Sequence, residues 1–255
     1  MDKLEHKLGF LTRFSLFDLI TSHWASRSPA FQDPRGLGRI ALAGVFLGFI
    51  ASSSLFCVFL FPSLTRLFLV IFLSSIYHLS EFAMTAYGHP NTVTYDNFLF
   101  YQSFDYTFVR IIYHLEYFLW YFLCPSFGES KIGTIISTIG LIGVIIGQGI
   151  RTLAMYQAGE SFTHIVATSH KTKHTLVTSG VYQYFRHPSY FGWFLWATSL
   201  QLLLLNPVLF VLSIVVAYAF FSDRIPYEED ALVEFFGAEY IEYKAKTPTW
   251  IPFIK

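Results

Sequence analysis

The strongest constraint on the fold is a series of apolar runs, each long enough to cross a lipid bilayer. A spanning helix needs ~20 consecutive, mostly apolar residues, and such runs occupy residues 40–61, 64–84, 97–123 and 132–155. Only 13% of the 255 residues are charged, whereas soluble domains carry about 25%. The chain therefore cannot cover itself with an ordinary polar surface, and we predict an integral membrane protein.

The last third of the chain has a different character. A polar loop at residues 157–175 follows the fourth run, and an apolar stretch at 191–221 is interrupted by Asn206-Pro207. Proline suits the first turn of a new helix, so we predict a tight hairpin of two short spans. An acidic helix is expected at residues 223–247, and the segment 7–24 is expected to lie in the membrane interface or to cross obliquely.

These elements predict an all-α fold, a polytopic transmembrane helical bundle of about six to eight spans. We divide the chain into N-terminal membrane helices at residues 1–156 and a C-terminal region at residues 157–255. The hairpin is an even number of spans, so the loop before it and the C-terminus share one side, and positive residues favour the cytosol. Glycines of the fourth run suit close helix packing in lipid, namely Gly133, Gly140, Gly143, Gly147 and Gly149.

Charged residues near the membrane are the first candidates for a site. Arg151 lies close to the loop end of the fourth run, and an intramembrane arginine is by default a functional hypothesis, although it could instead snorkel to the headgroups. Arg224 and Glu228 are four residues apart and share one helix face. As an exposed pair they would contribute only ~0.5 kcal/mol, but beside a pocket they could divide labour between a substrate and a cofactor.

A bend before the hairpin concentrates polar groups. Gly180 permits a tight turn, and Pro188 fixes the backbone at the entrance to a membrane helix. His187, Ser189 and Tyr190 then surround the N-terminus of that helix. Exposed amides at a helix N-terminus favour an anionic group such as a carboxylate.

Several motifs of this region resemble one known family, the isoprenylcysteine carboxyl methyltransferases. His-Pro-x-Tyr alone is weak evidence, because other membrane enzymes contain it, but the combination and its order are specific. The matching segments are Ala158-Gly, Phe162, His164-x-Val166, Leu176-Val-Thr-x-Gly-Val-Tyr182, Arg186-His-Pro-Ser-Tyr-x-Gly-Trp-Phe194, Asp223-Arg224, Glu228-Glu229, Phe235-Phe-Gly237, Tyr240, Tyr243 and Pro252-Phe-Ile254.

The resemblance implies a catalytic region at residues 157–255 that binds S-adenosyl-L-methionine in a cytosolic pocket and releases S-adenosylhomocysteine. It implies an endoplasmic-reticulum membrane location, contact with membrane lipids, and substrates that are prenylated C-terminal cysteines of CaaX proteins such as small GTPases. Arg224 would bind the substrate and serve catalysis, and no metal is expected. Arg151 is a second catalytic candidate because of its position in the fourth run. The implied cofactor residues are His174, Thr175, Leu176, Val177, Tyr182, His187, Pro188, Ser189, Tyr190 and Glu228.

The expected chemistry is in-line methyl transfer to a carboxylate oxygen. A carboxylate is already an anion at neutral pH, because its reference pKa is ~4 or below, so no general base is required. The task that remains is alignment of the reacting atoms. Arg224, together with Arg151, would orient the carboxylate by charge-assisted hydrogen bonds.

Three other functions are alternatives to this prediction. A phospholipid N-methyltransferase shares the His-Pro-x-Tyr feature, but its amine acceptor gains nothing from nearby arginines. An NADPH-dependent sterol reductase should carry more basic residues for the extra phosphate, and a non-enzymatic scaffold leaves the polar bend unexplained. Lys+Arg and Asp+Glu balance at 17 each, so no overall charge favours nucleic acid.

Overall fold

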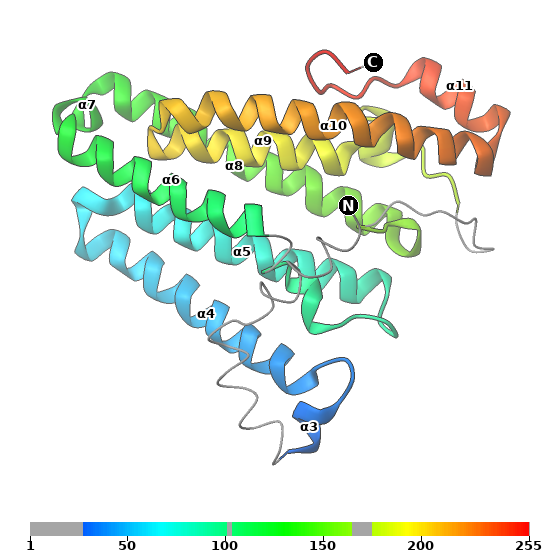
Figure 1. The fold of residues 1–255 in the computed structure, drawn as a ribbon, viewed down its shortest axis with the longest axis horizontal. Helices are drawn as coiled ribbons and strands as arrows, with labels where there is room; N and C mark the ends of the chain where they lie inside the picture. The colour runs from blue at the N-terminus through cyan, green and yellow to red at the C-terminus, as the bar shows by residue number, and fades with distance from the viewer. Residues whose placement is uncertain (1–27, 101–103, 165–174, 255) are drawn as a thin grey trace. The chain divides into compact units, whose positions relative to one another are not determined.

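The computed structural model describes residues 28–100, 104–164 and 175–254, and these residues form helices and 3-10 turns with no strand among them (Figure 1). The chain divides into two compact units. The first takes the described residues up to Ala86 together with Pro90–Leu115, and the second takes Tyr87–His89 and the residues from Glu116 onward. Each unit is described by itself below.

The first unit is built around two long helices. α4 begins after Gly36, whose φ of 72° is left-handed, and it ends before Pro62, which has no amide to continue the helix. Ala43 and Leu47 of α4 form a buried cluster with two aromatic residues that follow α5 in the chain. The elements are α3 Pro29–Gln32, α4 Leu37–Leu60, the 3-10 turn Pro62–Leu64, α5 Thr65–Gly88, the 3-10 turn Tyr95–Phe98 and the first part of α6 Phe104–Leu123.

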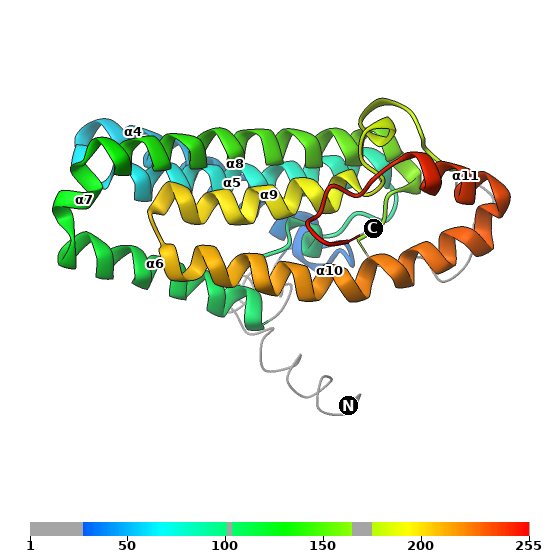
Figure 2. The same cartoon turned by 90° about the horizontal axis from the view of Figure 1, so that it is seen from above.

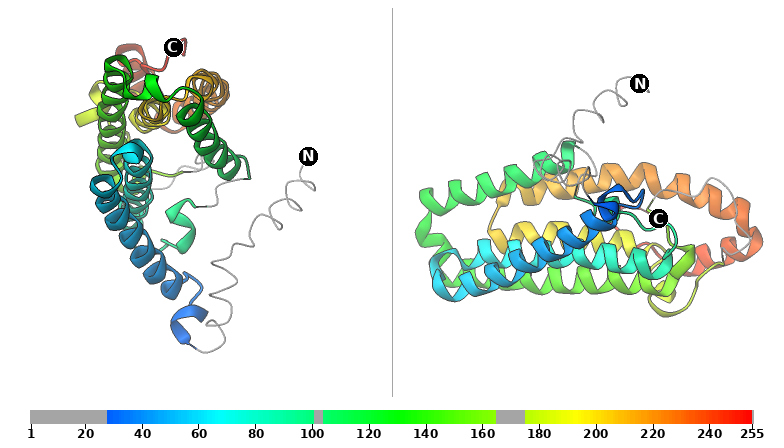
Figure 3. Two further views of the ribbon diagram at one scale, coloured as in Figure 1. Left: turned by 90° about the vertical axis from the view of Figure 1, so that its left-hand side faces the viewer. Right: turned by 90° about the horizontal axis from the view of Figure 1, so that it is seen from below.

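The second unit consists mainly of three long helices laid side by side. Figure 2 shows α9 between α8 and α10, and the right-hand view of Figure 3 shows the same order from below. Only Leu205 and Asn206 separate α9 from α10, and Pro207 opens α10 as predicted. The elements are α7 Pro125–Glu129, α8 Lys131–Ala158, the 3-10 turns Gly159–Ser161 and Gly180–Gln183, α9 Pro188–Leu204, α10 Pro207–Phe236 and α11 Ala238–Lys246.

The glycines of α8 bring that helix against the backbone of α9. A Cβ added to Gly140 would lie 2.3 Å from the amide nitrogen of Leu203, and one added to Gly147 would lie 2.6 Å from that of Trp196. The expected close packing is confirmed at these positions. Gly149 faces open space instead, with nothing within 4 Å of an added Cβ.

Among the described residues, four helical segments are long and apolar enough to cross a membrane: Leu37–Leu60, Pro62–Gly88, Lys131–Ser161 and Pro207–Phe236. The all-α membrane fold is therefore confirmed, while a count of six to eight spans stays a prediction. The segment expected at residues 7–24 lies outside the described residues.

One predicted helix start is wrong. The run at 97–123 was expected to be helical throughout, but residues 97–100 lie outside any α-helix, and the described part of α6 is Phe104–Leu123. Before it, Thr94 and Asn97 form a capping box around a 3-10 turn, and Leu99 then adopts a left-handed φ of 57°. These local hydrogen bonds end the 3-10 turn, so apolar composition does not set the start of the helix.

The predicted boundary at residue 223 is also wrong. α10 continues without a break from its apolar part through Asp223 and the internal Pro226 to Phe236. The break comes at Gly237, which has a φ of 56° that only glycine adopts readily. The acidic residues that follow the apolar stretch therefore extend one long helix, and α11 is a separate short helix.

Candidate functional site

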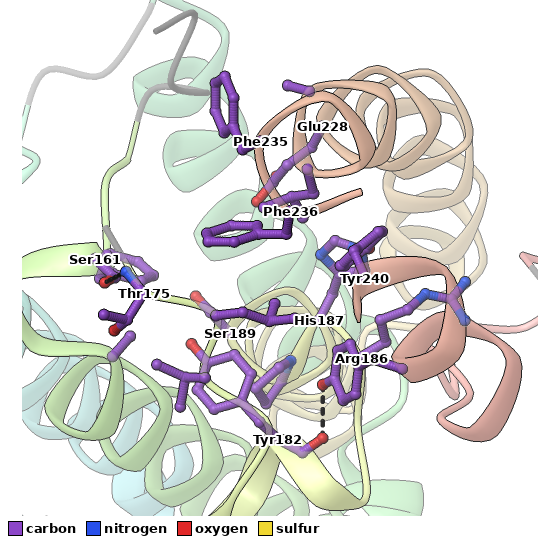
Figure 4. A pocket seen from close by; sticks show the side chains of 18 of the residues that line it. Ser161, Thr175, Tyr182, Arg186, His187, Ser189, Glu228, Phe235, Phe236 and Tyr240 are labelled. Carbon is purple, nitrogen blue, oxygen red and sulfur yellow. Dashed lines mark hydrogen bonds between the residues drawn. The ribbon is translucent and has the colours of Figure 1, made fainter. Parts of the chain in front are cut away.

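The described pocket lies in the second unit, where the end of α8, the start of α9, the end of α10 and α11 meet. Figure 4 shows Glu228, Phe235 and Phe236 reaching in from α10, with Ser161 and Thr175 close together at another wall. Most of its lining is aromatic or aliphatic. The lining residues are Ala158, Ser161, Phe162, Thr163, Thr175, Leu176, Val177, Tyr182, Arg186, His187, Pro188, Ser189, Tyr190, Glu228, Ala231, Leu232, Phe235, Phe236, Tyr240 and Tyr243.

The turn that carries Tyr182 into the pocket depends on Gly180. Its φ is +63°, and an added Cβ would lie 2.3 Å from Oε1 of Gln157. That same oxygen accepts a hydrogen bond of 2.8 Å from the amide of Val181. The tight turn expected at Gly180 is thus confirmed, and a side chain there would strain the backbone and displace the Gln157 side chain that holds Val181.

Arg151 supports the start of α9. Its side chain is buried, and its Nη1 donates to the hydroxyl of Ser189 at 3.0 Å and to the Ser189 carbonyl at 3.3 Å. The alternative that Arg151 snorkels to the headgroups is therefore wrong. Arg151 touches the pocket through Ser189 and is not itself among the lining residues.

Arg224 and Glu228 meet at the hydroxyl of Tyr190. Nε of Arg224 donates to this hydroxyl at 2.8 Å, and the hydroxyl in turn donates to Oε2 of Glu228. Nη2 of Arg224 donates to the carbonyl of His164 at 2.7 Å. The shared helix face is confirmed, and Glu228 lines the pocket whereas Arg224 reaches it through Tyr190.

Glu229, the neighbour of Glu228, is buried on another face of α10. Its carboxylate accepts hydrogen bonds from Nε of Arg186, from Nε2 of His187 at 3.1 Å and from Nζ of Lys244 at 2.5 Å. The side chains of Arg186 and Glu229 are each only 3% exposed. Glu229 thereby ties the start of α9 and α11 to α10, and we call these four residues the Glu229 clamp.

The segment after α11 completes the support of Arg186. The guanidinium Nη1 of Arg186 donates to the carbonyls of Lys244 at 3.2 Å and Thr247 at 2.7 Å, and the Arg186 amide donates to the carbonyl of Pro248 at 2.8 Å. Nε1 of Trp250 donates to the carbonyl of Tyr184 at 2.9 Å. The segment that leads into α9 is therefore held by backbone groups that come much later in the chain.

Two tyrosines, one half-buried and one buried, fix the floor of the pocket. The Tyr182 hydroxyl donates to the carbonyl of Ala154 at 3.2 Å, and the Tyr243 hydroxyl donates to the carbonyl of Tyr182 at 2.6 Å, the bond drawn in Figure 4. Burial raises the pKa of both phenols above its ordinary value. Both hydroxyls therefore stay neutral and keep donating at physiological pH.

Most of the residues implied by the sequence come together here. Thr175 is anchored by its amide, which donates to the hydroxyl of Ser161 at 3.2 Å. His174 lies outside the described residues, and within the described segments no His, Cys, Asp and Glu cluster could hold a metal ion. The implied residues that line the pocket are Thr175, Leu176, Val177, Tyr182, His187, Pro188, Ser189, Tyr190 and Glu228.

Sequence reasoning missed the contribution of Glu229 and of the aromatic residues near the end of α10. A signal for Glu229 was present, because consecutive helix residues point about 100° apart, so the side chains of Glu228 and Glu229 leave α10 in different directions. The aromatic positions Phe235, Phe236, Tyr240 and Tyr243 line the pocket. The sequence predicted no role for these residues beyond their place in the family motifs.

Comparisons with known proteins show the family of the chain. A model of the "Isoprenylcysteine carboxyl methyltransferase (ICMT) family" matches residues 138–234. Protein-S-isoprenylcysteine O-methyltransferase from Homo sapiens is 40% identical over 229 residues, which cover 90% of this chain and 77% of the human protein. Its counterpart from Saccharomyces cerevisiae is 42% identical over 218 residues, 84% of this chain and 87% of the yeast protein.

A solved structure shows the same fold. It is the structure of a eukaryotic intramembrane Ras methyltransferase, an isoprenylcysteine carboxyl methyltransferase, solved without a monobody. It matches with a TM-score of 0.82 and 31% sequence identity, over 99% of this chain and 90% of that chain.

Proposed function

Because the chain belongs to the isoprenylcysteine carboxyl methyltransferase family, we propose a division of labour within its site between Glu228, which faces a cofactor, and Arg224, which holds the acceptor. The enzyme is a membrane methyltransferase that methylates the prenylcysteine carboxylate of CaaX proteins. The family assignment removes the phospholipid N-methyltransferase, the sterol reductase and the scaffold as alternatives. We propose which cofactor the enzyme uses and which residues perform the reaction.

The lining of the pocket fits S-adenosyl-L-methionine. Aromatic and aliphatic side chains such as Phe235, Phe236 and Leu176 suit an adenine ring, and the carboxylate of Glu228 suits hydroxyl groups or a positive charge. The N-terminus of α9, with the charge of Arg151 held against Ser189, suits the carboxylate of the methionine part. When bound, S-adenosyl-L-methionine supplies an activated methyl group, and S-adenosylhomocysteine is the product.

The single observation that carries the division of labour is the position of Arg224. Its Nε and Nη2 are engaged by Tyr190 and His164, and within the described segments its Nη1 makes no hydrogen bond. The outer end of the guanidinium therefore has donors left for an acceptor carboxylate, in the geometry that arginine offers to such groups. We propose that Arg224 binds and orients the prenylcysteine carboxylate.

The side chains around the acceptor need only position it. The carboxylate is ionised at neutral pH, since its reference pKa lies near 4 or below, so no residue has to remove a proton. Arg224 restricts its rotation, and the half-buried rings of Tyr182 and Tyr190 limit the access of water from that side of the pocket. The proposed role of Arg151 is indirect: it fixes Ser189 and with it the start of α9.

We further propose that the enzyme works in the endoplasmic-reticulum membrane with its pocket facing the cytosol, on prenylated CaaX proteins such as small GTPases. Basic residues flank the pocket segment and follow α10, with Arg186, Lys244 and Lys246 among them, and loops rich in such residues tend to be cytosolic. A protease-protection or tag-accessibility assay on sealed microsomes tests this orientation.

The first test of the proposed function is methyl transfer. Purified enzyme in detergent is given S-adenosyl-L-methionine with a labelled methyl group and N-acetyl-S-farnesylcysteine. A base-labile methyl ester on the farnesylcysteine is the expected product. Transfer that does not depend on S-adenosyl-L-methionine, or no binding of this compound to the folded enzyme, would refute the cofactor assignment.

The roles of Arg224 and Glu228 are separated by paired variants. Arg224→Ala is expected to lower kcat/KM for the acceptor by roughly 10- to 100-fold, as for loss of a charge-assisted hydrogen bond, with little change in cofactor affinity. Glu228→Ala is expected to weaken cofactor binding itself. Arg35→Ala is the matched control, because Arg35 is an exposed arginine paired with Asp33, and it should leave both constants unchanged.

A further inference from the structure

One hydroxyl group touches both halves of the proposed site. The phenolic oxygen of Tyr190 accepts a hydrogen bond from Nε of Arg224 at 2.8 Å and donates its own proton to Oε2 of Glu228. A phenol has a single proton to donate. Its two hydrogen bonds are therefore fixed in direction, with Arg224 as the donor and Glu228 as the acceptor.

The ring that carries this hydroxyl has little freedom to move away. It is stacked on the imidazole of His187, with ring centroids 5.5 Å apart and planes 9° from parallel, and it packs against Phe221 at 5.1 Å. His187 is in turn held by Glu229 in the Glu229 clamp. The hydroxyl is therefore a fixed point between two charged side chains that have longer and more flexible stems.

The two charged partners face different ligands in the proposed function. Glu228 lines the pocket, whereas Arg224 is held outside the lining by Tyr190 and by the carbonyl of His164. A ligand that orders the Glu228 carboxylate also orders the hydrogen bond it accepts from Tyr190, and with it the Arg224 guanidinium. A second ligand that binds Arg224 then loses less conformational entropy, which is positive coupling between the two sites.

We propose that Tyr190 is a positioning residue that couples binding of the cofactor at Glu228 to binding of the prenylcysteine carboxylate at Arg224. This inference rests on the proposed function. It adds that the enzyme takes its two ligands cooperatively, and that the phenolic hydroxyl transmits the effect. Neither ligand has to touch that hydroxyl.

The coupling is measured with ligands that do not react. The dissociation constant of S-adenosylhomocysteine is determined for the full-length enzyme in detergent, without and with saturating N-acetyl-S-farnesylcysteine. In the unmodified enzyme the acceptor is expected to tighten S-adenosylhomocysteine binding about tenfold, within the usual range for coupled sites. By linkage, S-adenosylhomocysteine should tighten binding of the acceptor by the same factor.

The Tyr190→Phe variant keeps the ring and its stacking on His187 but loses the hydroxyl. Because the hydroxyl that transmits the effect is gone, the coupling factor is expected to fall to within about twofold of one. By reciprocity, both binding measurements should give this same factor. Two tyrosine variants serve as controls. Tyr182→Phe removes another pocket hydroxyl, one that donates only to the Ala154 carbonyl, and should keep the tenfold factor. Tyr227→Phe alters a side chain that is 58% exposed and should change nothing.

A second variant keeps the inference testable if Tyr190→Phe does not fold. Glu228→Gln preserves size but replaces the charged acceptor of the Tyr190 hydrogen bond, and it should also reduce the coupling factor toward one. A tenfold factor that persists in either folded variant overturns the inference, as does a factor of one in the unmodified enzyme. Loss of S-adenosylhomocysteine binding in the unmodified, folded enzyme would instead overturn the proposed function.

Discussion

The second unit holds two buried carboxylates near opposite ends of α10, and they are satisfied in different ways. Glu116 of α6 lies at the first turn of α10, where its oxygens accept hydrogen bonds from the amides of Val208 at 2.8 Å and Leu209 at 2.9 Å, and from Nε1 of Trp120 at 3.1 Å. Glu229, near the other end, accepts from the side chains of the Glu229 clamp.

Glu116 acts as a helix cap, whereas Glu229 connects helices through contacts that depend on its negative charge, and we call these contacts a charge-dependent joint. Glu116 uses neutral donors at the positive end of a helix dipole, an arrangement that satisfies a carboxylate without a counter-charge. It fixes α6 to the start of α10, and any good acceptor would serve there. Glu229 meets the buried guanidinium of Arg186, so its negative charge, and not only its hydrogen-bonding capacity, is needed.

Removing the charge of Glu229 should have the largest effect. Glu229→Gln leaves the Arg186 guanidinium buried without its counter-ion, which costs about 3–5 kcal/mol in the free energy of unfolding. Methyl transfer is expected to fall with it, because the start of α9 loses its anchor. The measurement is the thermal unfolding midpoint in detergent, alongside the transfer assay. A variant as stable as the unmodified enzyme would mean that Glu229 does not need its charge and that the two carboxylates do not differ in this respect.

Changes at Glu116 should have an intermediate effect that depends on the acceptor and not on the charge. Glu116→Ala removes a helix cap and should cost about 1–2 kcal/mol, whereas Glu116→Gln keeps one carbonyl oxygen and should cost less. Unfolding midpoints of the two variants provide the comparison, and the KM for acceptor should stay unchanged in both. Equal loss in Glu116→Gln and Glu116→Ala would mean that this site, too, depends on charge.

The smallest effect is expected within the Glu229 clamp itself, at Lys244. Its side chain is 45% exposed, so water replaces much of what the ion pair provides, and Lys244→Met should cost less than about 1 kcal/mol. The same unfolding measurement applies. A loss as large as that of Glu229→Gln would show that the exposed lysine, and not the buried arginine, makes the joint charge-dependent.

Helices could be predicted from the sequence where an apolar run is long enough for a spanning helix and where a proline marks the start of a helix. The runs at 40–61, 64–84 and 132–155 correspond to α4, α5 and α8, and Pro207 opens α10 as expected. The two failures have one cause, since hydropathy reports the solvent around a helix and not where it begins or ends. Asp223 is more polar than the stretch before it but still helical, and Phe98 and Leu99 are apolar but lie outside any α-helix.

The site could be predicted only in part, and chiefly through motifs. The segments at 175–177 and 187–190 do line one pocket with Glu228, although their roles in binding stay predictions. The Glu229 clamp was out of reach because its members are far apart in the chain, with Arg186 and Glu229 separated by 43 residues. The sequence around Arg186 or Glu229 does not show which distant residue each will contact in the folded protein.

The backbone bonds of Arg186 also bear on the order in which the enzyme is made. Its guanidinium and amide are satisfied by carbonyls of Lys244, Thr247 and Pro248, which the ribosome adds after α8, α9 and α10. The pocket therefore cannot assemble in its native form until these last residues have been made, because Arg186 lacks its carbonyl partners before then. A translation product that ends before residue 248 is expected to be inactive, which makes catalytic competence one of the last properties that the growing chain acquires.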